Sequence, residues 1–227
     1  MNQYMKLLLP VLGLLSFQCL RAQDHRSIQL LMDASRTTYF TTDPVIRKQV
    51  DSAFKMASAV LNSAEFQQAI SNMTFNAKSY CSGYAKTPAG TADRIPGKRV
   101  LDSIFREPAV TMGFELKEKD GPLGLTTPGT YHTTAWYESI QENMPAFHSF
   151  AYALAASLCH EYMHQVGFCH MYCIGGWLCP PHKRLNEKNG KPDPRFMTED
   201  VTYKVGWTAY HILMDWKKTG VNPLTGK

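Results

Sequence analysis

The stretch LCHEYMHQVGFCH, residues 158–170, contains three histidines at a spacing that is typical of metal ligands. If the stretch begins as a helix, His160 and His164 lie on one face, one turn apart. Gly167 follows three residues later and favours the positive φ angle at which a helix ends. The chain can then double back and bring His170 to the same point. The spacing predicts a metal site with three imidazole ligands and a fourth position open to water.

Glu161 stands next to the first of these histidines. It is turned by about 100° around the helix from His160, so its carboxylate lies beside the metal rather than on it. Zinc favours such nitrogen ligands and keeps a water in its catalytic sites. Zn2+ would lower the pKa of that water and polarise a carbonyl, while Glu161 would take the proton and deliver it to the leaving amine. The pattern predicts a zinc-dependent hydrolase of peptide bonds.

His160, Glu161, His164, Gly167 and His170 together spell H-E-x-x-H-x-x-G-x-x-H, and this stretch is similar to the signature of the metzincin clan of zinc endopeptidases. The resemblance implies an active-site cleft between a larger upper part, about 23–167, and a smaller lower part, about 168–227. It also implies that substrate lies extended along an edge strand ahead of the motif helix. TYHTTAWYES, residues 130–139, is a candidate for a strand near that edge, and an ordinary buried strand is the alternative.

The clan also has a methionine turn below the metal, often with a tyrosine two residues after the methionine. Met197 is the methionine at a matching distance, but Glu199 stands where that tyrosine would be, so a loop-packing role for Met197 is equally open. Tyr203 is the phenol of EDVTYKVG, residues 199–206, and the clan's tyrosine comes from this region. It could donate to the oxyanion of peptide hydrolysis, or its ring could pack into the lower core.

Patterns elsewhere predict the framework of the fold. Asp43 caps a helix with Pro44 at its first position, and a shorter helix restarts at Asn62 or Ser63. The long helix has apolar residues at helical spacing: Ile46, Val50, Phe54, Ala57 and Leu61.

The middle of the chain is rich in β-branched and aromatic residues. KRVLDSIF (98–105), AVTMGFELKE (109–118) and TYHTTAWYESI (130–140) are expected as strands of one sheet, separated by clusters such as KDGPLGLTTPG (119–129). An Ala- and Leu-rich helix, 146–166, a loop of about thirty residues and a closing helix in the later part of 201–218 should follow. These elements predict an α+β catalytic domain: a mixed sheet with a backing helix, and an active-site helix above a small C-terminal subdomain that ends in a helix.

Residues 1–22 are typical of a secretory signal peptide, with Lys6 before an apolar stretch and Ala22 at the expected cleavage site. The apolar stretch is too short for a stable membrane span. Lipid attachment at Cys19 is the alternative, although the residues before it match that pattern poorly. Residues 23–227 are enough for a single domain. We therefore expect a secreted, periplasmic or cell-surface protein.

The net charge of the chain indicates which classes of partner it can bind. The net charge of +5 falls to about +3 when Lys6 and Arg21 leave with the signal peptide, and no basic run with interleaved aromatic residues occurs. This argues against nucleic-acid binding. We expect a monomer whose partner is a protein or peptide substrate.

Five cysteines follow the signal peptide: Cys81, Cys159, Cys169, Cys173 and Cys179. Because this number is odd, at most two disulfides can form among them. In an exported chain we expect at least one disulfide among the last four, holding the loop around His170. The alternative is a structural zinc cluster of Cys169, Cys173, Cys179 and His182.

Two other functions remain open at this point. A different zinc hydrolase would take Glu187 or Glu199 as its third ligand in place of His170. A metal-binding adhesion or inhibitor module would keep the same fold without turnover. Glu161 argues against this module, because a purely structural metal site has no use for a carboxylate beside its first ligand.

Overall fold

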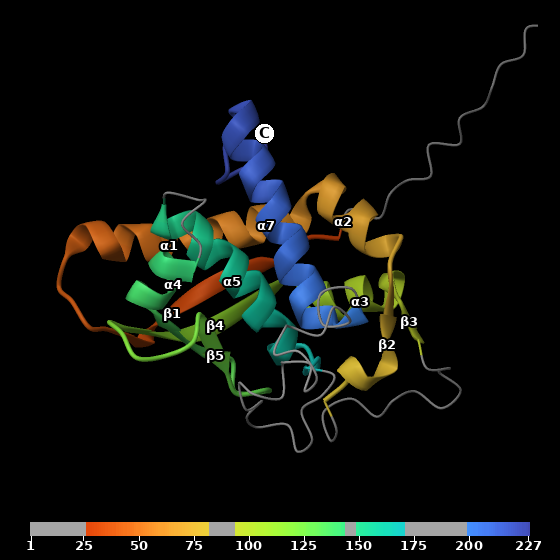
Figure 1. Ribbon diagram of the computed structural model, residues 1–227, viewed down its shortest axis with the longest axis horizontal. Helices are drawn as coiled ribbons and strands as arrows, with labels where there is room; N and C mark the ends of the chain where they lie inside the picture. Colours follow the sequence, from red (N-terminus) through yellow and green to blue (C-terminus); the bar gives the residue numbers. More distant parts are fainter. Residues whose placement is uncertain (1–25, 82–93, 144–148, 171–198) are drawn as a thin grey trace, which may run out of the picture.

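The protein has an α+β fold built around one mixed four-stranded sheet, seen in the computed structural model of Figure 1. The structure describes residues 26–81, 94–143, 149–170 and 199–227. The strands of the main sheet are β1 (Gln29–Tyr39), β4 (Ala109–Lys117), β6 (His132–Trp136) and β5 (Gly124–Thr126), in that spatial order. A second, two-stranded sheet pairs β2 (Thr74–Asn76) with β3 (Arg94–Pro96) in antiparallel fashion.

The main sheet changes direction at one edge. β1, β4 and β6 run parallel, whereas β5 is antiparallel to β6 and occupies the edge. The strand predicted in residues 130–139 is confirmed for His132–Trp136, which form β6, whereas the chain turns into helix α4 (Tyr137–Asn143) from Tyr137. β6 pairs on both sides and lies one position inside the edge. The edge strand, β5, comes from residues 119–129, which we expected to be a loop between two strands. Its three residues are too few to give a periodic signal against the surrounding glycines and prolines.

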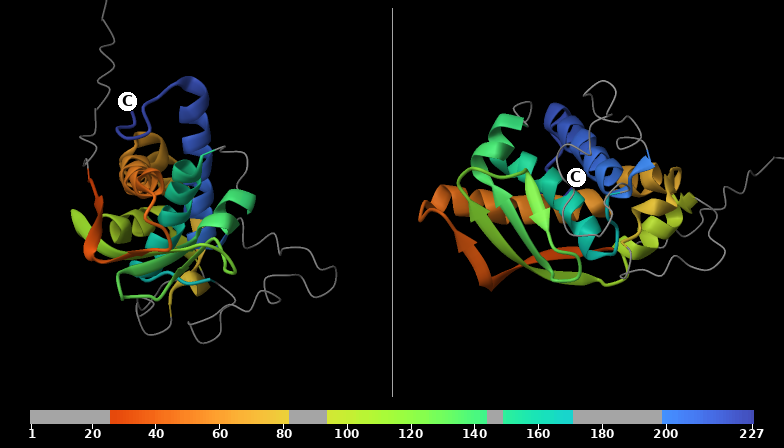
Figure 2. Two further views of the ribbon diagram at one scale, coloured as in Figure 1. Left: turned by 90° about the vertical axis from the view of Figure 1, so that its left-hand side faces the viewer. Right: turned by 60° about the horizontal axis from the view of Figure 1, so that its bottom comes forward.

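Helices cover one face of this sheet, as the two views of Figure 2 show. The helices are α1 (Pro44–Asn62), α2 (Ala64–Ser71), α3 (Gly97–Ile104), α4 (Tyr137–Asn143), α5 (Phe150–Gln165) and α7 (Val201–Thr219), with a 3-10 turn, η1, at Ala77–Ser79. α1 and α5 pack against each other above the sheet, and α7 packs along α5. The sheet residues beneath them, Val110, Met112, Phe114 and Leu116 of β4, alternate into the core.

The long helix near the N-terminus forms as the sequence predicts. The Asp43 side chain accepts a hydrogen bond from the backbone N–H of Val45, and Pro44 takes the first helical position. Its buried residues recur at helical spacing and include Val50, Phe54, Ala57 and Leu61. This helix packs against both the sheet and α5.

Residues 98–105 are a helix, so the strand that we predicted there is wrong. α3 buries Val100 and Ile104, four residues apart, while Asp102 is exposed and binds Arg26. An apolar pair at this spacing marks one helix face. The β-branched content of the segment outweighed that spacing in the sequence-based prediction, and tertiary packing overrides such propensities.

α5 is the central helix and is buried along almost its whole length. It ends as predicted: the helix is capped at Val166, and Gly167 adopts a φ of 99°. α7 begins earlier than predicted, at Val201, because the Asp200 side chain caps it by accepting from the N–H groups of Thr202 and Tyr203.

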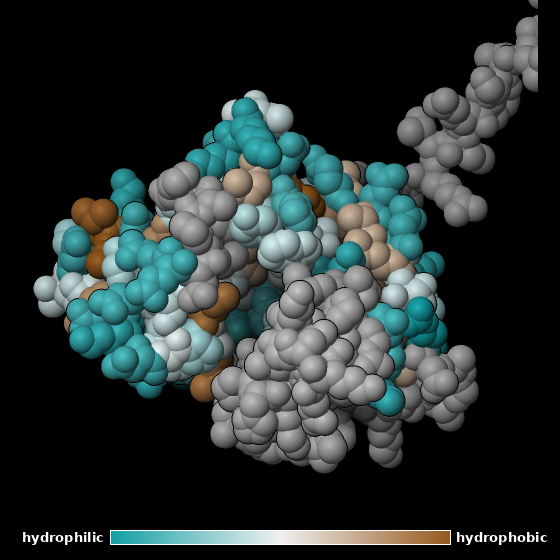
Figure 3. Space-filling model, viewed as in Figure 1, coloured by the Kyte–Doolittle hydropathy of each residue, from teal (hydrophilic) through white to brown (hydrophobic). Residues whose placement is uncertain are grey.

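The described residues on the face shown in Figure 3 are mainly hydrophilic, with hydrophobic residues exposed singly or in small groups. In the described ranges, no helix combines the length and the apolar character needed to cross a lipid bilayer. The predicted signal peptide, Cys19, Met197, Glu187 and most of the long loop lie outside the described residues.

Candidate metal centre

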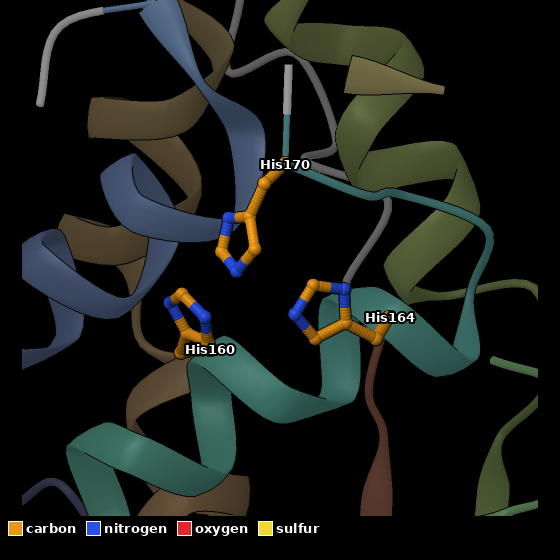
Figure 4. Close-up of side chains that lie close together, drawn as sticks. All are labelled: His160, His164 and His170. Atoms are coloured by element: carbon orange, nitrogen blue, oxygen red, sulfur yellow. The ribbon is translucent and has the colours of Figure 1, made fainter. Parts of the chain in front are cut away.

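Three imidazoles gather where the end of α5 meets the start of α7. His160 and His164 project from the last turns of α5, and His170 follows just beyond the turn at Gly167. One nitrogen from each ring can be chosen so that the three ligand atoms all lie within 4.8 Å of one another. Figure 4 shows one ring nitrogen of each imidazole turned toward the space that the three rings share. We call this group the histidine cluster.

The ring of His164 is held by a backbone carbonyl. Its Nδ1 lies 2.8 Å from the carbonyl oxygen of Phe168. Because a carbonyl oxygen only accepts, Nδ1 carries the proton, and Nε2 keeps its lone pair for a metal. Phe168 is itself fixed by an isolated β-bridge to Tyr80, with their rings stacked at 5.2 Å between centroids. The turn after α5 therefore orients the second histidine as well as placing the third.

His170 faces polar side chains from the first turn of α7. Its Nδ1 is 2.9 Å from Oγ1 of Thr202 and 3.7 Å from Oδ2 of Asp200. Both partners are fully buried. Neither residue was predicted as part of the site, because Thr202 and His170 are 32 positions apart and no local pattern records their contact.

α7 also packs closely against the first histidine. A Cβ added to Gly206 would lie 2.8 Å from Cβ of His160. Only a residue without a side chain allows the two helices to approach this far. Glycine lowers helix stability by about 1 kcal/mol relative to alanine, so its presence inside α7 has a packing reason.

Glu161 is buried beside the cluster, with 5% of its surface exposed. It points toward the edge strand: a Cβ added to Gly124 of β5 would lie 2.5 Å from Oε1 of Glu161 and 2.8 Å from its Cδ. The carboxylate thus sits between the motif helix and the edge of the sheet. This is the position that the sequence predicts for it, next to the histidines and not among the grouped ligand atoms.

Tyr203 lies against the same cluster. Its ring centroid is 4.7 Å from that of His170 and 5.1 Å from that of His160. The predicted location, a segment leading into the closing helix, is corrected slightly: Tyr203 is on the first turn of α7, and its backbone N–H is held by Asp200.

A disulfide lies immediately before the third histidine. Cys169 is bonded to Cys81, 88 residues earlier in the chain. Backbone bonds reinforce this link, since Cys169 N–H donates to the Ser79 carbonyl at 2.6 Å and Cys81 N–H donates to the Gly167 carbonyl at 3.0 Å. The segment that carries His170 is therefore anchored to the turn at η1.

This pairing corrects part of the cysteine prediction. A disulfide does hold the chain next to His170, but the partner of Cys169 is Cys81 and not one of the three other cysteines near the motif. The alternative zinc cluster that needs a Cys169 thiolate is excluded by the same bond. Cys159 is a buried free thiol in α5, and burial raises its pKa. Cys173, Cys179 and His182 lie outside the described residues.

Glu199 does not join the cluster. Its carboxylate accepts from the Asn76 side-chain amide at 3.2 Å and pairs with Arg94 at 3.3 Å, which ties it to the small sheet. Among the described residues, the group of metal-ligating side chains consists of the three histidines. The geometry therefore favours His170 over Glu199 as the third ligand.

The donor set fits zinc. Three imidazoles from a rigid helix and an anchored turn supply borderline nitrogen ligands, which Zn2+ prefers with tetrahedral geometry. The proton on Nδ1 of His164 leaves the lone pair where a ligand needs it. The three histidines form a possible metal site.

Comparison of the chain with protein-family models, with curated proteins and with solved structures finds no match. The likeness to the metzincin clan therefore rests on the eleven-residue motif and on the histidine cluster that this motif forms in the fold.

Proposed function

We propose that this protein is a zinc-dependent endopeptidase of metzincin-like design. The observation that carries the proposal is the joint placement of the histidine cluster and Glu161 on one buried helix, with the carboxylate at the edge of the sheet. A site that only bound metal would need no acidic group there.

His160, His164 and His170 would hold the ion. When bound, zinc supplies a Lewis acid that polarises the substrate carbonyl and lowers the pKa of a water. Glu161 accepts a proton from the attacking water as its oxygen bonds to the carbonyl carbon. The same carboxyl then returns that proton to the leaving amine as the C–N bond breaks. The low exposure of Glu161, 5%, limits competing exchange of its proton with solvent.

Tyr203 is the candidate for stabilising the oxyanion. Its ring lies beside two of the three histidines, so its phenol belongs to the same region as the reacting carbonyl. A hydrogen-bond donor at that point acts more strongly in the transition state than in the ground state. Packing of the ring against His160 and His170 is the alternative role for the same contacts.

The edge strand β5 is the candidate for binding the substrate backbone. Within the described residues it pairs only with β6, and Leu125 in its middle is 43% exposed. An extended peptide can add to such an edge through main-chain hydrogen bonds. Gly124 would then bring the peptide past Glu161.

The cellular setting belongs to the same proposal. The Cys81–Cys169 disulfide is typical of proteins that work in an oxidising compartment. It supports the expectation that residues 1–22 are a signal peptide and that the chain acts outside the cytoplasm.

Digestion of casein and of a peptide library by the purified protein tests the function. We expect cleavage that a chelator abolishes and that added Zn2+ restores. A zinc-loaded protein that cleaves none of these substrates on long incubation would instead favour the non-catalytic module, and cleavage that is insensitive to chelation would reject the metal mechanism.

A further inference from the structure

Two buried polar side chains lead away from the third histidine, first Thr202 and then Asp200. Thr202 Oγ1 lies 2.9 Å from Nδ1 of His170 and 2.7 Å from Oδ1 of Asp200. Thr202 and Asp200 are both 0% exposed. Polar groups buried this deeply cost free energy unless their hydrogen bonds are satisfied. The need to satisfy them fixes which group donates and which accepts in each bond.

The direction of each bond follows from what each group can do. The Thr202 hydroxyl donates its proton to the Asp200 carboxylate. Having only one proton, that hydroxyl can then only accept from His170, so Nδ1 of His170 must carry a hydrogen. The Nε2 lone pair of His170 is left for a ligand bond.

Asp200 performs two tasks with one carboxylate. Oδ1 also accepts from the backbone N–H groups of Thr202 at 2.9 Å and Tyr203 at 3.2 Å, and thereby caps α7. The positive end of the helix dipole favours the ionised carboxylate at this position. Oδ2 faces Nδ1 of His170 at 3.7 Å, so the negative charge lies close to the ring.

We propose that Thr202 and Asp200 are positioning residues for the third ligand, and that they hold His170 in the Nδ1–H tautomer with Nε2 directed into the histidine cluster. The inference rests on the proposed metal site. His164 reaches the same tautomer by a different route, through the Phe168 carbonyl. The route through Thr202 adds a carboxylate charge and connects the ligand to the cap of α7, the helix that carries Tyr203.

Substitutions at Thr202 separate this role from simple packing. Thr202→Val keeps the branched shape and removes the hydroxyl, whereas Thr202→Ser keeps the hydroxyl. Thr208→Val is the matched control on the same helix, because the Thr208 hydroxyl donates to the backbone carbonyl of Lys204 and not to a side chain. Asp200→Asn removes the charge while leaving an oxygen that can still cap the helix.

Two measurements test the role of these residues without an activity assay. Competition with a chromophoric chelator gives the zinc dissociation constant. Nitrogen-15 NMR of the metal-free protein gives the tautomer of His170, which in water would favour the Nε2–H form. We expect Nδ1–H in the wild type, zinc binding about 10- to 100-fold weaker in Thr202→Val, and near-normal binding in Thr202→Ser and Thr208→Val. Asp200→Asn should weaken binding without unfolding α7.

Two results would overturn the proposal: an Nε2–H tautomer of His170 in the wild-type protein, or zinc binding by Thr202→Val as tight as by Thr208→Val. The tautomer of the wild type decides the question even if Thr202→Val fails to fold. A wild-type protein that binds zinc and shows the expected tautomer, yet cleaves no protein, would contradict the proposed function and support the positioning role.

Discussion

Gly124 on the edge strand lies so close to Glu161 that a Cβ at position 124 would come within 2.5 Å of the Glu161 Oε1 atom. The contact joins two residues that are 37 positions apart in the chain, one on the sheet and one on the motif helix. The atom that would be struck is the end of a side chain, so the fold can relax while the carboxylate moves. A substitution at Gly124 should therefore move the carboxylate of Glu161, the proposed base.

Gly124→Ala should therefore lower peptide hydrolysis and leave the zinc content unchanged. A displacement of the reacting group by about 1 Å can cost up to about a hundredfold in rate, so we expect kcat/KM to fall roughly ten- to a hundredfold. Gly220→Ala serves as the control: it strains a φ of 77° at the end of α7, away from the cluster, and should reduce stability alone. Unchanged hydrolysis in Gly124→Ala would remove Glu161 from the position of the base.

His170→Ala should lose most bound zinc, because two histidines on α5 cannot complete a three-nitrogen site. Metal analysis of the dialysed protein checks this, with His132→Ala as the control. His132 is on β6 and lies outside the grouped ligands. Undiminished zinc in His170→Ala would mean that another residue is the third ligand.

Cys81→Ser should weaken both the fold and the metal site. The disulfide joins residues 88 positions apart, and loss of a native disulfide typically costs about 2–5 kcal/mol of unfolding free energy. The turn at Gly167 and Cys169 would then be held next to His170 by backbone hydrogen bonds alone. Denaturant unfolding and zinc competition measure the two effects. Zinc binding equal to that of the wild type would show that the backbone bonds at Ser79 are sufficient to hold the turn.

Tyr203→Phe separates the two roles of that side chain. If the phenol stabilises the oxyanion, zinc content and stability should stay almost unchanged while kcat falls by roughly ten- to a thousandfold. The ring contacts with His160 and His170 are retained in this variant. A correctly folded Tyr203→Phe protein with wild-type kcat would assign the residue to packing.

The parts of the fold that local patterns predict are those formed by short-range contacts. The cap at Asp43 and the turn at Gly167 each depend on neighbours within a few positions, and both appear as expected. The histidines also lie together because i, i+4 spacing and one turn are enough to bring them there. For α3, the local pattern gave the wrong prediction: the β-branched residues suggested a strand, whereas the spacing of Val100 and Ile104 is that of the helix that forms.

What supports the site comes from contacts that no local pattern records. The partner of Cys169 is 88 residues away, and Thr202 reaches His170 across 32 positions. The edge strand has three residues and gives no periodic signal. Such contacts depend on how α7, the sheet and the turn after α5 meet, so the sequence predicts the ligands and the base more readily than the residues that orient them.

Glu161→Gln, with zinc content and peptide cleavage measured on the same preparation, tests the central claim most directly. The substitution removes the proposed base and no ligand, and glutamine has nearly the same shape. We predict a folded protein with wild-type zinc content and almost no cleavage. A zinc-loaded Glu161→Gln protein that retains appreciable turnover would contradict the assignment of Glu161 as the group that activates water.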